Sequence, residues 1–471
     1  MAENRGRELA RNTFIITLGR VSTQFISFIL LPLYTSKLSA SEYGTVDLIS
    51  TIVQLLIPVI SLMIDQGCFR FLINCSDDTN KKIIVTTSFG LQSIFSVVFL
   101  IIYCPICIIF KLQYKIFIAL ILIVTTYSNL FLQVARGLRK TIEYSFGSFV
   151  CSITTIMINI ICIILLKMGA TGMLAGTFIG NLICCIYLFF RLNVIKYLSF
   201  KSFKLVMAKK ELKYSFPLVP NQLSLWVMNS SDRLIIAYFL GTAANGILAV
   251  SHKFPTIYLT FFNIFQLAWH ETGAIHYFDS DRDEFFSEML EKVISIFSTL
   301  CIGLIICLPL VFNLLVDISY HDAYYNIPIY LVASLFNVVV GLLGVVYVAL
   351  KKTGEIAKTT IIASILNIAS NILLIRFIGL FAASLSTFVG YLVIMIYRIV
   401  DTRKYLNVRY NIRKYVFISC GIVVSCLVYY SENLIMSVIA VPAFFIFAIM
   451  INSKMLSDII EFSKKSLEDR K

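Results

Sequence analysis

The stretch IVTTSFGLQSIFSVVFLIIYCPICIIF at residues 84–110 contains no charged side chain. About 20 apolar residues in a helix are enough to cross the hydrocarbon core of a bilayer, so this stretch predicts a membrane-spanning helix. Similar apolar stretches recur from residue 12 to residue 451. They predict an all-α integral membrane protein without a soluble domain of any size.

Fourteen membrane-spanning helices are expected from these stretches and from the charged and turn residues that separate them. The chain is 59% hydrophobic and only 14% charged, which is more apolar than a water-soluble chain of this length. The first six spans are expected near residues 12–35, 45–68, 84–110, 116–135, 143–166 and 171–190. The other eight are expected near 213–240, 246–268, 289–312, 327–350, 357–376, 379–400, 415–431 and 434–451.

The net charge of +14, from 40 Lys and Arg against 26 Asp and Glu, reflects membrane topology. Most of the basic residues lie in alternate loops, including the basic linker at 192–212. Because Lys and Arg are retained on the cytoplasmic side of membrane proteins, both termini and the basic loops are expected in the cytoplasm. Nucleic-acid binding is not expected, since no recognisable nucleic-acid-binding module accompanies the basic stretches.

The two halves of the chain resemble each other. The segment LSASEYGTVD at 38–47 aligns with LGTAANGILA at 240–249, which places Gly44 over Gly246. The segment TFIGNLICCIY from Thr177 likewise aligns with TFVGYLVIMIY further along the chain. Since each half contains six spans, an even number, the halves are expected to share one orientation and to form a parallel repeat.

The repeat predicts how the chain is divided. Two six-helix lobes are expected, followed by two extra spans. The predicted boundaries are an N-terminal lobe at 1–191, a cytoplasmic basic linker at 192–212, a C-terminal lobe at 213–400, and spans 13 and 14 with a cytoplasmic tail at 401–471.

Polar residues fall on one face of four predicted helices, at helical spacing. Spans 1 and 7 carry Thr13, Thr17, Arg20, Gln24 and Ser27, and Gln222, Trp226, Asn229 and Arg233. Spans 2 and 8 carry Asp47, Thr51, Gln54, Ser61 and Asp65, and Lys253, Thr256, Thr260 and Asn263. One such stripe would suit hydrogen bonding between helices. Four stripes in matching positions of the repeat predict that these spans line one hydrated central cavity.

Three cations lie inside these spans, namely Arg20, Arg233 and Lys253. A charged side chain at the bilayer centre costs about 2.5–3.5 kcal/mol on insertion scales unless it is hydrated or paired. Their presence predicts a cationic cavity for an anionic substrate, because a guanidinium binds phosphate through paired hydrogen bonds. The alternative that Arg233 merely marks a hydrated helix end remains open.

The candidate site residues follow from these patterns. The candidates for substrate binding in the cavity are Arg20, Gln24, Gln222, Asn229, Arg233 and Lys253. The candidates for ion coupling or charge pairing are Asp47, Asp65 and Asp232.

No enzyme signature is found in the sequence. It contains no HExxH motif, no Walker loop and no GxSxG motif, and its four histidines are scattered. Most of the 12 cysteines lie in apolar stretches and are expected to act as small apolar side chains. We therefore expect no catalytic residue, no bound metal and no cofactor. Transport is expected to draw on a Na⁺ or H⁺ gradient or on the membrane potential.

The segments ARNTFIITLGRVSTQFISFILLPLYTSKLSASEYGTVDL and NSSDRLIIAYFLGTAANGILAVSHKF resemble the polysaccharide biosynthesis flippases of the multidrug/oligosaccharidyl-lipid/polysaccharide exporter superfamily, the Wzx-type O-antigen (repeat-unit) flippases. The resemblance covers nearly the whole chain. It implies a MATE-like V shape and alternating access. It also implies movement of a polyprenyl-diphosphate-linked oligosaccharide repeat unit from the cytoplasmic to the outer leaflet. Related lipid II flippases use arginines in the cavity, and Arg20 is the position most like them.

The resemblance also implies a setting and partners. The expected location is the bacterial cytoplasmic (inner) membrane, and the expected partners are the lipid-linked oligosaccharide, the lipid bilayer, and a polysaccharide polymerase and glycosyltransferases. A monomer is expected. Two other functions stay open, a MATE-like antiporter of drugs or small molecules, and a membrane polysaccharide polymerase, which would be an enzyme.

The role expected for Arg20 has a direct test. Replacing the guanidinium by a methyl group removes its bidentate contact with a phosphate. Arg20→Ala should therefore abolish export of the oligosaccharide repeat unit while the amount of protein in the membrane stays normal. Export and protein level would be measured in the same cells, and retained export would exclude this role.

Overall fold

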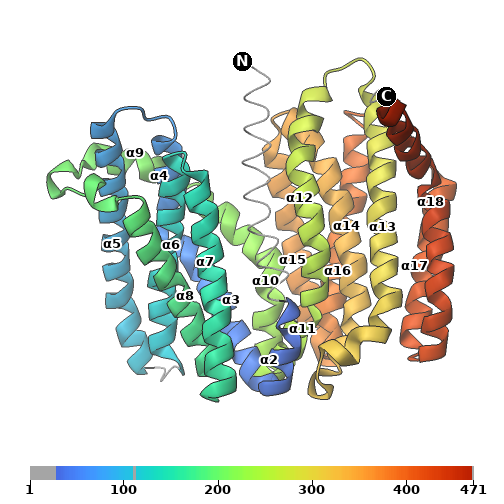
Figure 1. Ribbon diagram of the computed structural model, residues 1–471, viewed down its shortest axis with the longest axis horizontal. Helices are drawn as coiled ribbons and strands as arrows, with labels where there is room; N and C mark the ends of the chain where they lie inside the picture. The colour runs from blue at the N-terminus through green and yellow to red at the C-terminus, as the bar shows by residue number, and fades with distance from the viewer. Residues whose placement is uncertain (1–27, 110–112, 469–471) are drawn as a thin grey trace. The chain divides into compact units, whose positions relative to one another are not determined.

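The protein is described by a computed structural model, which places residues 28–109 and 113–468. The described residues form α-helices and short helical turns, with no β-strand among them (Figure 1). The predicted all-α class is therefore confirmed. Eleven of the described helices are long and apolar enough to cross a membrane, so the protein is a multi-pass integral membrane protein.

The eleven candidate spans match eleven of the fourteen expected ones. Of the other three, the span expected near 12–35 lies mostly outside the described residues. The spans expected near 213–240 and 246–268 are present as helices, α10 (Leu218–Leu240) and α12 (Lys253–His276). These two helices are more polar than the rest because they carry the predicted stripes, for example Asp232 and Arg233 in α10.

The chain forms two compact units, Met1–Gly246 and Ile247–Lys471. The described helices of the first unit are α2 (Leu31–Lys37), α3 (Ala40–Ser61), α4 (Ile64–Leu72), α5 (Asp78–Ile109), α6 (Lys115–Gly137), α7 (Thr141–Ile160), α8 (Gly169–Arg191), α9 (Leu205–Ser215) and α10. The boundary at Gly246 lies within α11 (Thr242–Ser251). Besides α12, the second unit contains α13 (Arg282–Leu315), α14 (Ala323–Ala349), α15 (Thr353–Ile378), α16 (Phe381–Thr402), α17 (Ile412–Tyr430) and α18 (Leu434–Glu468).

The division differs from the one expected at the linker 192–212. Helix α10 was expected to open the C-terminal lobe, but it packs on α3 and so belongs to the first compact unit. The reason lies in its polar side chains, which form hydrogen bonds with α3, as described below. The two extra C-terminal helices, α17 and α18, pack on α13 and belong to the second unit.

The glycines aligned by the repeat meet at a helix crossing in the first unit. A Cβ atom on Gly44 of α3 would collide with the carbonyl oxygen of Thr242 and the amide nitrogen of Gly246 at the start of α11. A Cβ atom on Gly246 would in turn collide with the carbonyl oxygen of Ala40. Small residues let helix backbones approach this closely. The contact is reciprocal, as expected where repeated segments meet.

In the second unit, α14 is the central helix. Of its 18 most apolar consecutive residues, 78% are buried, because α12, α13, α15 and α16 surround this helix. Tyr324 at its start stacks on Tyr429 of α17, and each phenol donates a hydrogen bond to the backbone carbonyl of the other residue, at 2.9 and 2.8 Å. This pairing satisfies both buried hydroxyls and fixes α17 to the second unit.

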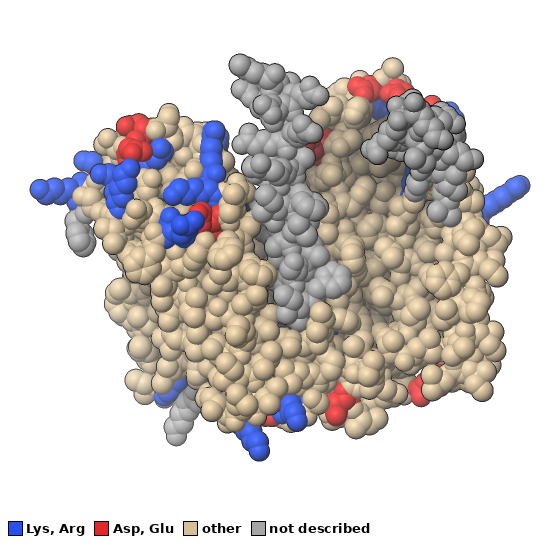
Figure 2. Space-filling model, viewed as in Figure 1, with Lys and Arg blue, Asp and Glu red and all other residues tan. Residues whose placement is uncertain are grey.

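Charge and hydrophobicity are distributed as a bilayer requires. On the face shown in Figure 2, the described charged side chains gather at the ends of the helices, and an uncharged band lies between them. Large apolar side chains of the membrane-spanning helices, such as Ile101, Leu373 and Val424, are more than half exposed. In water such surfaces would aggregate, whereas lipid chains cover them without cost.

The glycine crossing gives a stability prediction. Gly44→Ala places a methyl group against backbone atoms that cannot rotate away, so α3 and α11 must separate. Such overpacking costs about 1–3 kcal/mol. The thermal unfolding midpoint of the purified protein in detergent should fall. The matched control is Gly354→Ala in α15, where a Cβ meets nothing within 4 Å and the midpoint should not fall. Equal midpoints for the two variants would contradict the prediction.

Candidate functional site

The second predicted span is discontinuous. Its first part, α3, begins with a capping box in which Ser39 and Glu42 bond to each other's backbone amides. The helix contains Pro58 and ends at Ser61, and α4 starts at Ile64. Between them, Leu62 and Met63 have φ angles of +45° and +57°, a left-handed backbone conformation that residues other than glycine rarely adopt. Such breaks are tolerated within a membrane where the backbone lines a cavity.

A cavity of about 440 Å³ with a mixed polar and apolar lining lies at this break, inside the first unit. Residues Ser61, Met63, Asp65 and Gln66 of the break line one side of it. The other lining residues come from α3, α6, α7 and α10. They are Gln54, Ile57, Pro58, Thr126, Asn129, Leu132, Gln133, Tyr144, Gln222, Leu225, Trp226, Asn229 and Ser230.

The lining is rich in uncharged polar groups. Six side-chain amides face the cavity, namely Gln54, Gln66, Asn129, Gln133, Gln222 and Asn229. Each amide offers both donors and an acceptor, which matches the hydroxyl groups of a sugar. Asp65 is the only charged residue among the described lining, and its carboxylate accepts a hydrogen bond from the Gln66 side chain at 2.7 Å. The cavity therefore suits a polar ligand with many hydroxyls.

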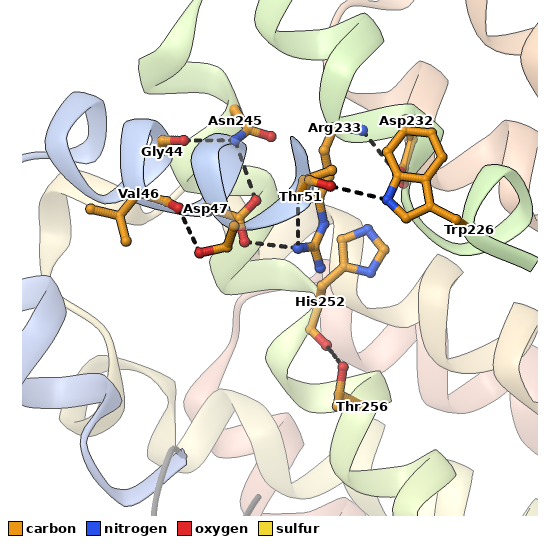
Figure 3. Close-up of polar contacts among 11 residues, drawn as sticks. Gly44, Val46, Asp47, Thr51, Trp226, Asp232, Arg233, Asn245, His252 and Thr256 are labelled. Carbon is orange, nitrogen blue, oxygen red and sulfur yellow. Dashed lines mark hydrogen bonds and ion pairs between the residues drawn. The ribbon is translucent and has the colours of Figure 1, made fainter. Parts of the chain in front are cut away.

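An ion pair joins α3 and α10 beside this cavity. The guanidinium of Arg233 donates to the carboxylate of Asp47 at 2.8 Å, and both side chains are about four-fifths buried (20% and 17% exposed). The Asn245 amide donates to the second carboxylate oxygen at 3.3 Å and to the Gly44 carbonyl at 2.9 Å. Figure 3 shows these groups pointing toward one another. Asp47 thus neutralises the cation and Asn245 fixes the carboxylate.

A second contact holds α10 against α3. The indole N–H of Trp226 donates to the backbone carbonyl of Thr51 at 3.1 Å (Figure 3). Thr51 is fully buried and its carbonyl is free to accept this bond in addition to its helical one. Since Trp226 also lines the cavity, this bond sets the position of one cavity wall.

The structure places the predicted site residues in three groups. Gln222, Asn229 and Asp65 come together in the cavity, while Asp47 and Arg233 form the ion pair next to it. Asp232 is buried, and its carboxylate accepts from the backbone N–H of Arg233 at 3.0 Å.

Three predicted residues are not among these groups of described residues. Lys253 is the first residue of α12 and belongs to the second unit. Arg20 and Gln24 fall outside the described residues. Their predicted contact with the substrate stays a prediction.

Several residues of the cavity and of the neighbouring ion pair did not belong to the predicted polar stripes. Asn129 and Gln133 of α6 lie four residues apart and so share one helical face, a pattern that could have marked them. Gln66 was missed because its position depends on the break at Leu62 and Met63, which no glycine announces. Asn245 was missed because its partner Asp47 lies far away in the chain.

The fold and the cavity define a class of protein: a multi-pass membrane protein in which a discontinuous helix and polar side chains build a cavity inside one helical unit. Residues 9–269 match the polysaccharide biosynthesis protein family, and the chain belongs to this family. No curated protein matches the chain.

Solved structures with the same fold are membrane transporters. The lipid II flippase MurJ in an inward closed conformation is similar with a TM-score of 0.68 at 16% identity, over 94% of this chain and 100% of MurJ. A MATE transporter in complex with MaL6 gives 0.57 at 14% identity, over 84% and 95%. A multidrug/oligosaccharidyl-lipid/polysaccharide exporter superfamily transporter from Pyrococcus furiosus gives 0.58 at 13% identity, over 84% and 94%. These likenesses establish the fold of that superfamily.

The ion pair gives a testable coupling. Asp47→Asn leaves Arg233 partly buried without its counter-charge, and Arg233→Gln likewise leaves Asp47 partly buried without its counter-charge. Hydrogen bonds between charged groups contribute about 1.5–3 kcal/mol, so each single variant should lose stability of this order. The double variant should lose less than the sum, with a coupling energy of about 1 kcal/mol in unfolding measurements.

A second double-mutant cycle on an exposed pair provides the control. Asp78 and Lys196 lie 3.2 Å apart with more than half of each side chain exposed, and they should show no measurable coupling. Strict additivity at Asp47 and Arg233 would contradict the structural role of the pair.

Proposed function

We propose that the protein is a flippase that moves a polyprenyl-diphosphate-linked oligosaccharide repeat unit from the cytoplasmic to the outer leaflet by alternating access. The observation that carries the proposal is the amide-lined cavity in an otherwise apolar protein. Gln66, Gln133 and Asn229 each make a hydrogen bond within the protein. The remaining donors and acceptors of the six amides cost hydrogen-bonding energy in a membrane unless a polar ligand or water satisfies them. The family and the fold of lipid and drug transporters support the same conclusion.

The lining favours the sugar part of such a substrate. Amide side chains can donate to and accept from sugar hydroxyls, and the rings of Tyr144 and Trp226 give flat apolar surfaces on the same cavity. At about 440 Å³ the cavity has the size of a small-molecule site and would hold part of an oligosaccharide at a time. We assign it to the sugar residues and not to the prenyl chain.

The diphosphate requires a cationic side chain to bind it. Arg233 is neutralised by Asp47 in the first unit, so we assign diphosphate binding to Arg20, supported by Gln24 on the same helical face. Lys253 is the corresponding candidate in the second unit. The proposal places the protein in the cytoplasmic membrane of a bacterium, as a monomer with both termini in the cytoplasm, alongside glycosyltransferases and a polymerase.

A second function is favoured by one observation. Asp65 is the only charged residue in the described cavity lining, and a carboxylate in such a cavity suits a cationic drug. A MATE-like antiporter is therefore the competing proposal. The two proposals differ in the substrate that crosses a membrane containing only this protein.

The cavity amides test the flippase proposal. Gln222→Leu with Asn229→Leu keeps side-chain size but removes two hydrogen-bonding groups from α10. Each hydrogen bond contributes about 0.5–1.5 kcal/mol, so flipping of a polyprenyl-diphosphate-linked oligosaccharide in reconstituted vesicles should slow about tenfold or more. The control is Ser224→Ala on the same helix, whose hydroxyl bonds only to its own helix at Pro220 and does not line the cavity.

The same vesicles separate the competing functions. Efflux of a cationic dye would be measured beside oligosaccharide flipping, with Asp65→Asn as the third variant. Flipping that depends on Gln222 and Asn229 supports the flippase. Dye efflux that depends on Asp65, with no flipping, would contradict it and establish the antiporter.

A further inference from the structure

A carboxylate is buried in the helix that precedes α10. Glu211 lies in α9, within a mostly basic run that reads KKELK at 209–213. The lysines of this run are exposed, but Glu211 itself is fully buried (0% exposed). A charged side chain without a counter-ion is rarely buried in this way, because removing it from water costs several kcal/mol.

The contacts of Glu211 come from α4 and α5. The hydroxyl of Ser88 in α5 donates to one carboxylate oxygen at 2.9 Å. The other oxygen is buried and has no hydrogen-bond partner among the described residues. A Cβ atom on Gly67 of α4 would lie 3.5 Å from the Glu211 Cβ, so α9 packs directly on α4. The apolar side chains of Ile64, Leu91 and Ala208 form a buried cluster that joins α4, α5 and α9.

Within the described part of the chain, no cation offsets the charge. From α4, the ionisable groups near Glu211 are the Cys68 thiol, which burial keeps neutral, and Asp65, and neither of them can supply a positive charge. From α5, Ser88 is the polar contact, and Lys81, two turns nearer the start of that helix, pairs with Asp78 at 3.1 Å. The first three turns of α10 contain no charged residue.

These surroundings favour the protonated carboxyl group. Burial raises the pKa of Glu211 to about 8, and the Ser88 hydrogen bond offsets this only in part. When protonated, Glu211 is neutral and fits the dry contact between α9, α4 and α5. When ionised, it requires water, which it can reach only if α9 moves away from α4 and α5.

We propose that Glu211 is a proton-binding site, and that α9 docks on α4 and α5 with the uptake of one proton from water and leaves them with its release. The proposal rests on the proposed transport function for its purpose, since it names the coupling ion as H⁺. Helix α9 is connected to the cavity in two ways, through its packing on α4 and through the chain that leads into α10. Helix α4 carries Asp65 and Gln66 of the lining, and α9 is followed after two residues by α10, which carries Gln222 and Asn229.

The direction of the pH dependence follows from the two states. The docked state holds its proton up to about pH 8, whereas an undocked Glu211 in water has its usual pKa near 4.5. Between these values docking takes up one proton, so the docking equilibrium weakens about tenfold for each pH unit. Docking is strongest below pH 4.5, weakens as the pH rises, and stops changing above about pH 8.

Cys68 provides a native reporter of docking. It is fully buried on α4, next to Glu211 and Ser88, so a thiol reagent reaches it when these contacts open. The purified full-length protein in lipid nanodiscs would be treated with a maleimide between pH 5.5 and 9. Modification of Cys68 would be followed by peptide mass spectrometry, separately from the other eleven of the 12 cysteines.

The comparison is between wild type and Glu211→Gln. The glutamine keeps the size of the side chain and an acceptor for Ser88 but cannot ionise. The wild-type rate divided by the variant rate should rise by up to tenfold per pH unit and level off near pH 8. The ratio cancels the general effect of pH on thiols. An ionised Glu211 would by itself make Cys68 less reactive, so a rise in the ratio reports opening.

Glu143→Gln is the matched control. Glu143 bonds to Tyr187 at 2.7 Å and pairs with Arg191, away from the α4 and α9 contact, so this variant should follow the wild type. A ratio that stays constant with pH, or a Glu143→Gln variant that behaves like Glu211→Gln, would overturn the proposal. Because labelling needs no substrate, loss of flipping in every variant would count against the transport function alone.

Discussion

The ion pair between Asp47 and Arg233 is the contact on which the described site depends. A membrane protein can keep a cation inside a helix only if the protein neutralises or hydrates it. Here the neutralising carboxylate lies on α3 and the cation on α10, so the two helices must stay together. The carbonyl of Thr51 and the indole of Trp226 add a second bond between the same helices. Together these bonds place α10 as a wall of the cavity.

Sequence repetition and charge act on the same crossing in different ways. Gly44 and Gly246 are equivalent in the repeat, and their mutual contact lets α3 and α11 approach. Asp47 has no acidic equivalent, because Ala249 stands at the aligned position. The glycine of the helix crossing is thus present in both halves of the chain, whereas the acidic residue of the ion pair is present only in the first. This explains why α10 packs on α3 and joins the first unit, although the repeat assigns it to the second half of the chain.

Hydropathy was enough to predict the fold class, because a protein in water could not keep so many apolar stretches of about 20 residues away from its surface. Helical spacing was enough to bring Gln222 and Asn229 to one cavity, since residues seven apart share a helix face. The rest depended on contacts between distant segments. Nothing near Leu62 and Met63 in the sequence announces a break, apart from Pro58, and so Gln66 was not expected in the lining. Glu211 lies in a basic run and could be recognised as buried only from the packing of α9.

The distribution of charge within the first unit has a consequence for selectivity. Its described cavity is lined by amides, while the nearby cation is already paired with Asp47. Amides recognise hydroxyl groups without favouring either sign of charge, so under the proposed function these amides would select sugars and contribute little to holding a diphosphate. The proposed function therefore assigns the attraction for the diphosphate to a surface other than these amides.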